Sequence, residues 1–208
     1  MNDQVDMKKR GFGKLAIGAG LAGAAFAHGA FAQETMPPEF RNIRRRERAL
    51  TEEQAWLILD KGVYGVLATV DKSSQSHGTP ISYAVDKERG YIFFHGASSG
   101  QKIDNMKQNP RVCFTVVGEA EPIFIHDPFD YSVYFASTMA YGEVEVLSGD
   151  EKKMSLLTIV KKYFPENVKG ADEYYDKFGP LIDVWKIKVN RITAKAHERG
   201  TKIEVPTS

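Results

Sequence analysis

The chain has 208 residues, 42% hydrophobic and 26% charged, which excludes a disordered, collagen-like or multi-spanning membrane protein. Its 28 Lys and Arg and 27 Asp and Glu give a formal net charge of +1, so no bulk electrostatic field attracts nucleic acid. A single cysteine excludes an intrachain disulfide and any cysteine-rich metal site, and the histidines have no metal-ligand spacing.

Residues 1–32 have the composition of an export signal peptide. Basic residues precede an apolar run from Leu15 to Ala27, which is too short for the roughly 20 residues of a membrane span. Ala30-Phe31-Ala32 is the expected cleavage site, and Ala25-Phe26-Ala27 is the alternative. Residues 33–40 contain two prolines and are expected to form a linker.

The basic part of this signal favours one export route. Residues 9–14, Lys-Arg-Gly-Phe-Gly-Lys, resemble the twin-arginine motif with Lys in place of the first Arg, and a general secretory signal is the alternative. We therefore expect a periplasmic or otherwise exported protein, without stable membrane insertion once the signal is removed.

The remaining chain, residues 41–208, is expected to form one domain. The spacing of its hydrophobic residues alternates between the period of a helix and that of a strand. Thr51 and Gln54 form a capping box that predicts a helix ending at Lys61-Gly62. Strands are predicted at residues 64–70, 79–85, 91–95, 111–117, 183–189 and 192–197, with 131–135 and 139–147 as two strands or one bent strand. Residues 119–130 are predicted to be a polar excursion.

Two further helices are predicted at residues 101–108 and 150–164, and a short one within 168–180. The helix at residues 150–164 is expected to bury one apolar stripe, made of Met154, Leu156, Leu157, Val160 and Phe164. Six or seven short, mostly antiparallel strands with three helices indicate a mainly β (α+β) fold, a barrel with helices on its outside.

The loop between the third strand and the 101–108 helix carries the most specific chemical signal. His95-Gly96-Ala97-Ser98-Ser99-Gly100-Gln101-Lys102 leads a strand through small residues into a helix start, where backbone N–H groups lack partners. Lys102 is unfavourable there for the helix alone, which points to a bound anion such as phosphate. An ordinary serine-capped helix with an exposed lysine is the alternative.

Four segments in order carry a resemblance to a known family: residues 64–69, 78–83, 91–97 and 100–114. Together they resemble the pyridoxamine-5′-phosphate-oxidase-like flavin-binding split barrel, and within it the 5-nitroimidazole-resistance (Nim) branch. The resemblance covers roughly residues 41–197. It implies a six- to seven-stranded antiparallel split β-barrel with flanking helices, forming a homodimer with FMN at the interface.

The resemblance also implies roles for individual residues. The phosphate-binding segment corresponds to Ser99, Gln101 and Lys102, and positions lining the flavin ring to Leu67, Ala68, Thr69, Pro80, Ile81, Ser82 and Tyr83. Ala97 and Ser98, in the same loop, are also expected to bind the cofactor. His95 matches a histidine beside the cofactor and is the catalytic candidate, able to bind substrate or deliver a proton. A packed core histidine is the alternative.

Two departures from the family pattern count against true pyridoxamine-phosphate oxidase activity. Gln101 stands where those enzymes have Arg, and their C-terminal substrate motif is not recognisable. We therefore expect an exported FMN-dependent oxidoreductase that reduces nitroaromatic or similar small molecules with an unknown electron donor. The alternatives are a haem-binding protein that uses His95 or His126 as a ligand, and a flavin-binding module without turnover.

Overall fold

A computed structural model of the protein describes residues 41–124 and 131–197. The predicted signal peptide, the linker and His126 lie outside the described residues. Within the described part, no helix combines the length and the apolar character needed to cross a membrane.

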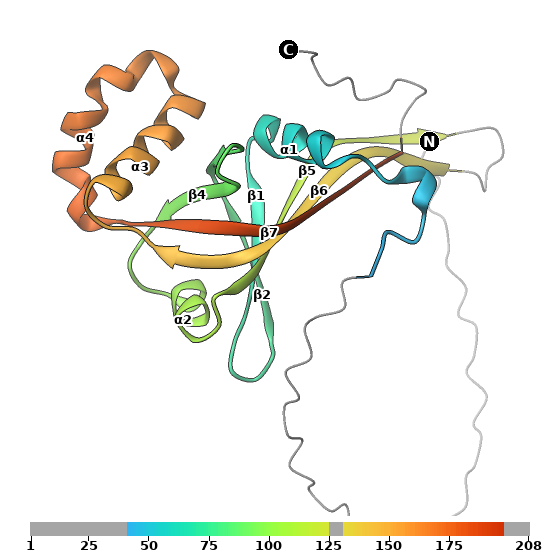
Figure 1. The fold of residues 1–208 in the computed structure, drawn as a ribbon, viewed down its shortest axis with the longest axis horizontal. Coiled ribbons are helices and arrows are strands. Elements are labelled where there is room, and N and C mark those ends of the chain that lie inside the picture. Colours follow the sequence, from blue (N-terminus) through green and yellow to red (C-terminus); the bar gives the residue numbers. More distant parts are fainter. Residues whose placement is uncertain (1–40, 125–130, 198–208) are drawn as a thin grey trace, which may run out of the picture. The chain divides into compact units, whose positions relative to one another are not determined.

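The described chain is an antiparallel seven-stranded sheet with flanking helices, which confirms the predicted fold class (Figure 1). The strands are β1 (Gly65–Val70), β2 (Ser76–Ile81), β3 (Tyr83–Asp86), β4 (Tyr91–Gly96), β5 (Arg111–Phe124), β6 (Tyr131–Val146) and β7 (Asp183–His197). The helices are α1 (Glu52–Lys61), α2 (Gln101–Gln108), α3 (Gly149–Tyr163) and α4 (Ala171–Phe178), with 3₁₀ turns η1 (Arg46–Arg48), η2 (Pro165–Gly170) and η3 (Gly179–Leu181). The capping box at Thr51 and Gln54 is present as predicted.

The strand order forces the sheet to close. The order is β2-β1-β5-β6-β7-β4-β3, so β2 and β3 lie at opposite edges. Only Ser82 separates them in the chain, and the sheet must therefore curl until its two edges meet at this residue. The prediction of one strand over 79–85 was wrong at this point, because the chain changes partner from β1 to β4 at Ser82.

Two strands are longer than predicted, and a third matches one of its two predicted alternatives. β5 continues through the expected polar excursion to Phe124, because its backbone pairs with β6 as far as Phe124↔Tyr131. β6 is one strand, the second of the two alternatives, and β7 is one strand where two segments were expected. Register shifts between Val117 and Glu119 and between Tyr141 and Gly142 interrupt these ladders without ending them.

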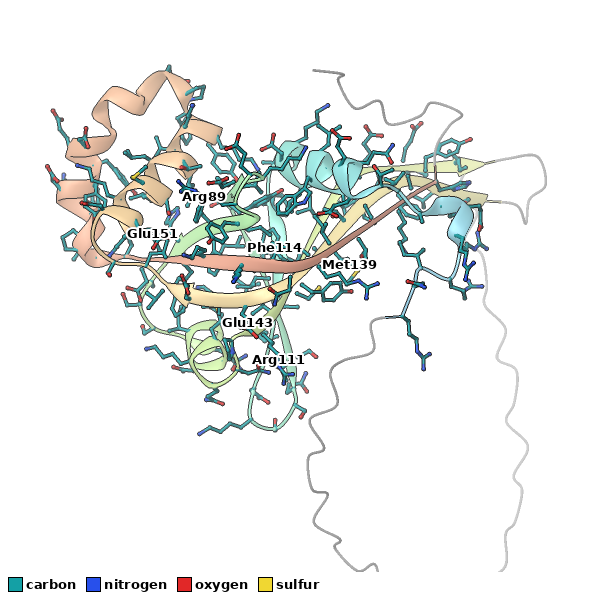
Figure 2. The ribbon with its side chains drawn as sticks, in the orientation of Figure 1. Arg89, Arg111, Phe114, Met139, Glu143 and Glu151 are labelled. Carbon is teal, nitrogen blue, oxygen red and sulfur yellow. The ribbon has the colours of Figure 1, made fainter. Side chains whose placement is uncertain are left out.

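The barrel interior is the main hydrophobic core. Leu67, Phe94 and Phe114 are fully buried there, and Figure 2 shows Phe114 among the strands. Helix α1 adds Trp56 and Leu59 to this core, and helix α2 adds Ile103 and Met106, and all four side chains are buried. Both helices are therefore held by burial of their apolar faces against the barrel core.

Helix α3 packs on the outer face of β3, β4 and β7 instead. Leu156 and Ile159 are the buried contacts, with Phe93 and Val184 opposite them. The predicted stripe was correct for Leu156 but wrong for its ends, because Met154 is 63% and Phe164 56% exposed.

An ion-paired lysine fixes the start of α3 to the sheet. Lys186 of β7 is only 8% exposed, and its Nζ lies 2.5 Å from Glu145 and 2.7 Å from Glu151 of α3, the residue labelled in Figure 2. Burial opposes the charged form, but the two carboxylates outweigh it and raise the pKa of Lys186. Removing either carboxylate would leave this buried charge short of a partner.

The Tyr163 hydroxyl holds the corner where the barrel closes. Its oxygen accepts the N–H of Tyr83 at 2.9 Å, and it lies 2.5 Å from the Val63 carbonyl oxygen and 2.9 Å from that of Tyr83. The hydroxyl has one proton, which it donates to one of these carbonyls. It thereby joins α3, the residue after Ser82 and the segment before β1.

We expect Tyr163→Phe to lower the free energy of unfolding by about 1–3 kcal/mol, because a buried backbone N–H loses its acceptor. Urea unfolding would measure the change. Tyr174→Phe is the matched control, since Tyr174 is 42% exposed, and it should change stability little. Equal stability of the two variants would contradict this role for Tyr163.

Candidate functional site

The loop after β4 forms an open cradle at the start of α2. Ala97, Ser98 and Ser99 are exposed, and Gly100 has φ of 114°, a conformation that favours glycine. The Gly100 carbonyl accepts the N–H groups of Ile103 and Asp104 at 2.9 and 3.1 Å. The two preceding N–H groups, at the first positions of the helix, have no preceding turn to bond and suit an anion.

Lys102 folds back over the end of β4. A Cβ built on Gly96 would lie 3.3 Å from the Lys102 Nζ, so any residue larger than glycine at position 96 would crowd the ammonium. Among the described residues, no carboxylate lies within ion-pair distance of Lys102. Its charge is thus available to a ligand. Gln101, beside it, is exposed.

A buried hydrogen bond ties this cradle to the barrel. Asn105 is 2% exposed, and its amide donates to the Thr69 hydroxyl at 3.0 Å. The Thr69 hydroxyl in turn donates to the His77 carbonyl at 3.3 Å. Sequence reasoning missed Asn105, because nothing in its local pattern separates it from the exposed polar residues of the same helix.

The residues predicted to line the flavin ring divide between the inner and the outer face of the barrel. Leu67, Thr69 and Tyr83 are fully buried on the inside, where Tyr83 donates its hydroxyl proton to the Leu59 carbonyl. Ile81 packs against the same core. A ligand outside the barrel therefore meets the side chains of the remaining three predicted residues, Ala68, Pro80 and Ser82, of which Pro80 and Ser82 are exposed.

His95 faces the outside of the barrel at the end of β4. Ile92 and Phe94 point into the core, and Phe93 points under α3, so His95 lies on the Phe93 side of the strand. Burial lowers the pKa of its imidazole, which favours the neutral form at pH 7. Its Nδ1 is buried without a hydrogen-bond partner among the described residues.

His95 and Ser82 border a pocket of about 750 Å³ whose opposite wall comes from the segment α3–η2–α4. The wall residues are Leu156, Ile159, Val160, Tyr163, Phe164, Glu166, Gly170 and Tyr174. The size is that of pockets that hold small organic ligands. This pocket could not be predicted from local sequence patterns, because its two sides are about 60–90 residues apart in the chain.

The site combines a cationic cradle, a neutral imidazole and an apolar pocket. Lys102, the loop serines and the end of β4 lie together around the cradle. His95 lies near the end of β4 and also lines the pocket. No group of three or more metal-ligating side chains occurs in the part of the chain that the structure describes. The arrangement can hold an anionic group and orient an aromatic molecule beside an imidazole.

Comparison with known proteins gives one family and one curated relative. Residues 51–196 match a family model described as Pyridoxamine 5′-phosphate oxidase. The 5a,11a-dehydrotetracycline/5a,11a-dehydrooxytetracycline reductase of Streptomyces rimosus is 42% identical over 55 residues, which are 26% of this chain and 39% of that protein. The match therefore spans well under half of the relative's length.

Solved structures share the fold at low sequence identity. A candidate 5-nitroimidazole antibiotic resistance protein from Bacteroides thetaiotaomicron has a TM-score of 0.58 and 20% identity, covering 71% of this chain and 85% of that one. A FAD and heme binding protein from Mycobacterium smegmatis has a TM-score of 0.64 and 15% identity, covering 71% and 72%.

The lowered pKa of His95 makes a prediction about stability and pH. The unfolded imidazole takes up its proton near pH 6.5, while the folded one does so only at lower pH. The unfolded state therefore binds more protons as the pH falls below 6.5, and the folded state loses stability. Relative to His95→Gln, the wild type should lose stability between pH 7.5 and about 5, as measured by urea unfolding. A difference that does not change with pH would rule out a buried, neutral His95.

Proposed function

Because the chain belongs to the pyridoxamine 5′-phosphate oxidase family, we propose that it is an exported, FMN-dependent oxidoreductase that reduces nitroaromatic or similar small molecules as a homodimer. The observation that carries the proposal is Lys102, folded across Gly96 without a carboxylate partner among the described residues, one residue from the start of α2. Export by the twin-arginine-like signal is part of the same proposal.

The cradle fits the phosphate of a flavin nucleotide. Lys102 supplies a full charge, Ser98 and Ser99 supply hydroxyl donors, and the start of α2 supplies backbone N–H groups. The glycine at position 96 leaves room for the lysine to reach the anion. The Asn105–Thr69 hydrogen bond holds the helix start against β1, so the donors are positioned before a ligand arrives.

When bound, a flavin supplies the electron transfer, and the protein supplies binding, orientation and electrostatics. Ser82, at the corner, and His95, at the end of β4, provide polar groups where the cradle meets the pocket. The His95 Nδ1 is buried without a partner, and an unpaired acceptor is less costly than an unpaired donor, which favours the proton on Nε2. The imidazole then donates a hydrogen bond through Nε2 and can pass on that proton.

The substrate side of the proposal draws on the relatives' names and on the pocket. The curated relative is named a reductase, and one structural neighbour is described by 5-nitroimidazole resistance. The pocket beside His95 has aromatic and aliphatic walls that suit an aromatic compound. Haem is the second candidate ligand, since a structural neighbour is named for both FAD and heme and His95 carries a neutral imidazole beside the pocket.

Replacing Lys102 tests the phosphate cradle. Lys102→Gln should weaken FMN binding roughly ten- to hundredfold, which corresponds to a charged hydrogen bond of about 1.5–3 kcal/mol. Lys107→Gln, an exposed lysine in the last turn of the same helix, is the matched control and should bind FMN normally. Fluorescence titration of protein stripped of cofactor gives both affinities. Unchanged binding by Lys102→Gln, or a Soret band in place of flavin absorption in the purified protein, would overturn the assignment.

An exposed apolar patch supports the homodimer. Val66 and Val117 lie on the same outer face of β1 and β5 and are 38% and 59% exposed, and Val63 and Tyr64, which precede β1 in the chain, are 70% and 62% exposed. Large apolar side chains exposed on neighbouring strands are typical of subunit interfaces.

Val66→Glu should therefore shift the protein from dimer to monomer, because a charge would be buried in the interface. Sedimentation velocity measures the change directly. Val146→Glu, an exposed valine at the far end of β6, should leave the dimer intact. A wild-type protein that sediments as a monomer while it retains FMN would contradict an interface at this face.

A further inference from the structure

The pocket beside His95 is largely separate from the cradle that would hold the phosphate. Its barrel side consists of Ser82 and His95, and none of residues 97–102 lines it. Its remaining walls come from α3, η2 and α4, which lie together at the end of the sheet where β7 begins (Figure 1). A flavin that is anchored by Lys102 and reaches Ser82 would leave this volume for another molecule.

The walls of the pocket are apolar and partly aromatic. Leu156, Ile159, Val160 and Tyr163 recur at the spacing of one helix face, so α3 presents a continuous stripe to the space. Phe164 and Tyr174 border the same space and remain 56% and 42% exposed. Large exposed aromatic side chains around a pocket of about 750 Å³ indicate a ligand that covers them.

The polar groups of the pocket are few. His95 and Ser82 lie on the barrel side, and the carboxylate of Glu166 lies on the η2 side. The Tyr163 hydroxyl is already bonded to the backbone at the barrel corner. Among the described side chains that line the pocket, Glu166 is the one with a full charge, and no lysine or arginine faces it there.

We infer that this pocket binds the second substrate, and that it selects uncharged or cationic aromatic compounds with a hydrogen-bond acceptor directed at His95, while it disfavours carboxylates. The inference rests on the proposed function, because it takes the flavin to lie on the Ser82 and His95 side. A carboxylate in this space would lose water without gaining a cationic partner among the described side chains that line it, and it would face Glu166.

The pocket can be tested by placing a larger side chain on its α3 wall. Val160→Trp should reduce the affinity for para-nitrobenzyl alcohol at least tenfold, as measured by calorimetric titration of the oxidised protein without a reductant. Met154→Trp, on the exposed face of the same helix, is the matched control and should bind as the wild type does. Both variants should retain the same amount of flavin. Unchanged binding in Val160→Trp, or loss of flavin with this substitution alone, would overturn the inference.

The charge selection can be tested without altering the core. Wild-type protein should bind para-nitrobenzyl alcohol and para-nitrobenzylamine about tenfold more tightly than para-nitrobenzoate. Glu166→Gln should improve para-nitrobenzoate binding several-fold and leave the alcohol unchanged, since an exposed carboxylate repels modestly. Equal or tighter binding of para-nitrobenzoate by the wild type would overturn the selection.

The same measurements separate this inference from the proposed function. Protein that holds FMN through Lys102 but binds all three probes equally would contradict the pocket assignment alone. Protein that never binds FMN, yet binds the uncharged probe in a manner sensitive to Val160→Trp, would contradict the flavin assignment. In that second case the pocket would be a ligand site, but it would not be a second-substrate site.

Discussion

The closure of the sheet through Ser82 is the constraint on which the rest of the structure depends. β2 and β3 occupy opposite edges of a seven-stranded sheet, and one residue connects them, so the edges must meet. At this corner the backbone leaves one ladder and enters another. The Tyr163 hydroxyl satisfies the Tyr83 N–H there, which brings the end of α3 to the corner and places the pocket beside it. The closure of the barrel and the position of the pocket therefore both depend on the change of strand partner at Ser82.

Local signals predicted those parts of the fold whose energetics are local. The capping box at Thr51 and Gln54 involves bonds between residues three apart, and both bonds form. The break at Ser82 and the continuation of β5 to Phe124 depend on pairing with other strands, which composition does not encode. Polar residues such as Glu119 and Glu121 suggested a loop, but the β6 ladder sets the backbone there.

The same distinction applies to the candidate site. The loop from Gly96 to Lys102 is contiguous, so its small residues and its lysine could be assigned together from the sequence. The family resemblance assigns Leu67 and Tyr83 to positions that line the flavin ring. Strand alternation turns their side chains into the core. Asn105 and the α3 stripe could not be found in this way, because their partners lie far away in sequence: Thr69 is 36 residues from Asn105.

The position of α3 decides how wide the pocket is, and an ion-paired lysine sets that position. Leu156 and Ile159 supply the buried apolar area that holds α3 to the sheet, but hydrophobic attraction is non-directional. The ion pairs of Lys186 are directional, because its ammonium lies between Glu145 of β6 and Glu151 of α3 and pairs with both. Tyr163 fixes the other end of the helix at the barrel corner. With α3 held by directional bonds at both ends, Val160 and its neighbours keep a defined distance from His95, as a pocket that selects ligands by shape and charge requires.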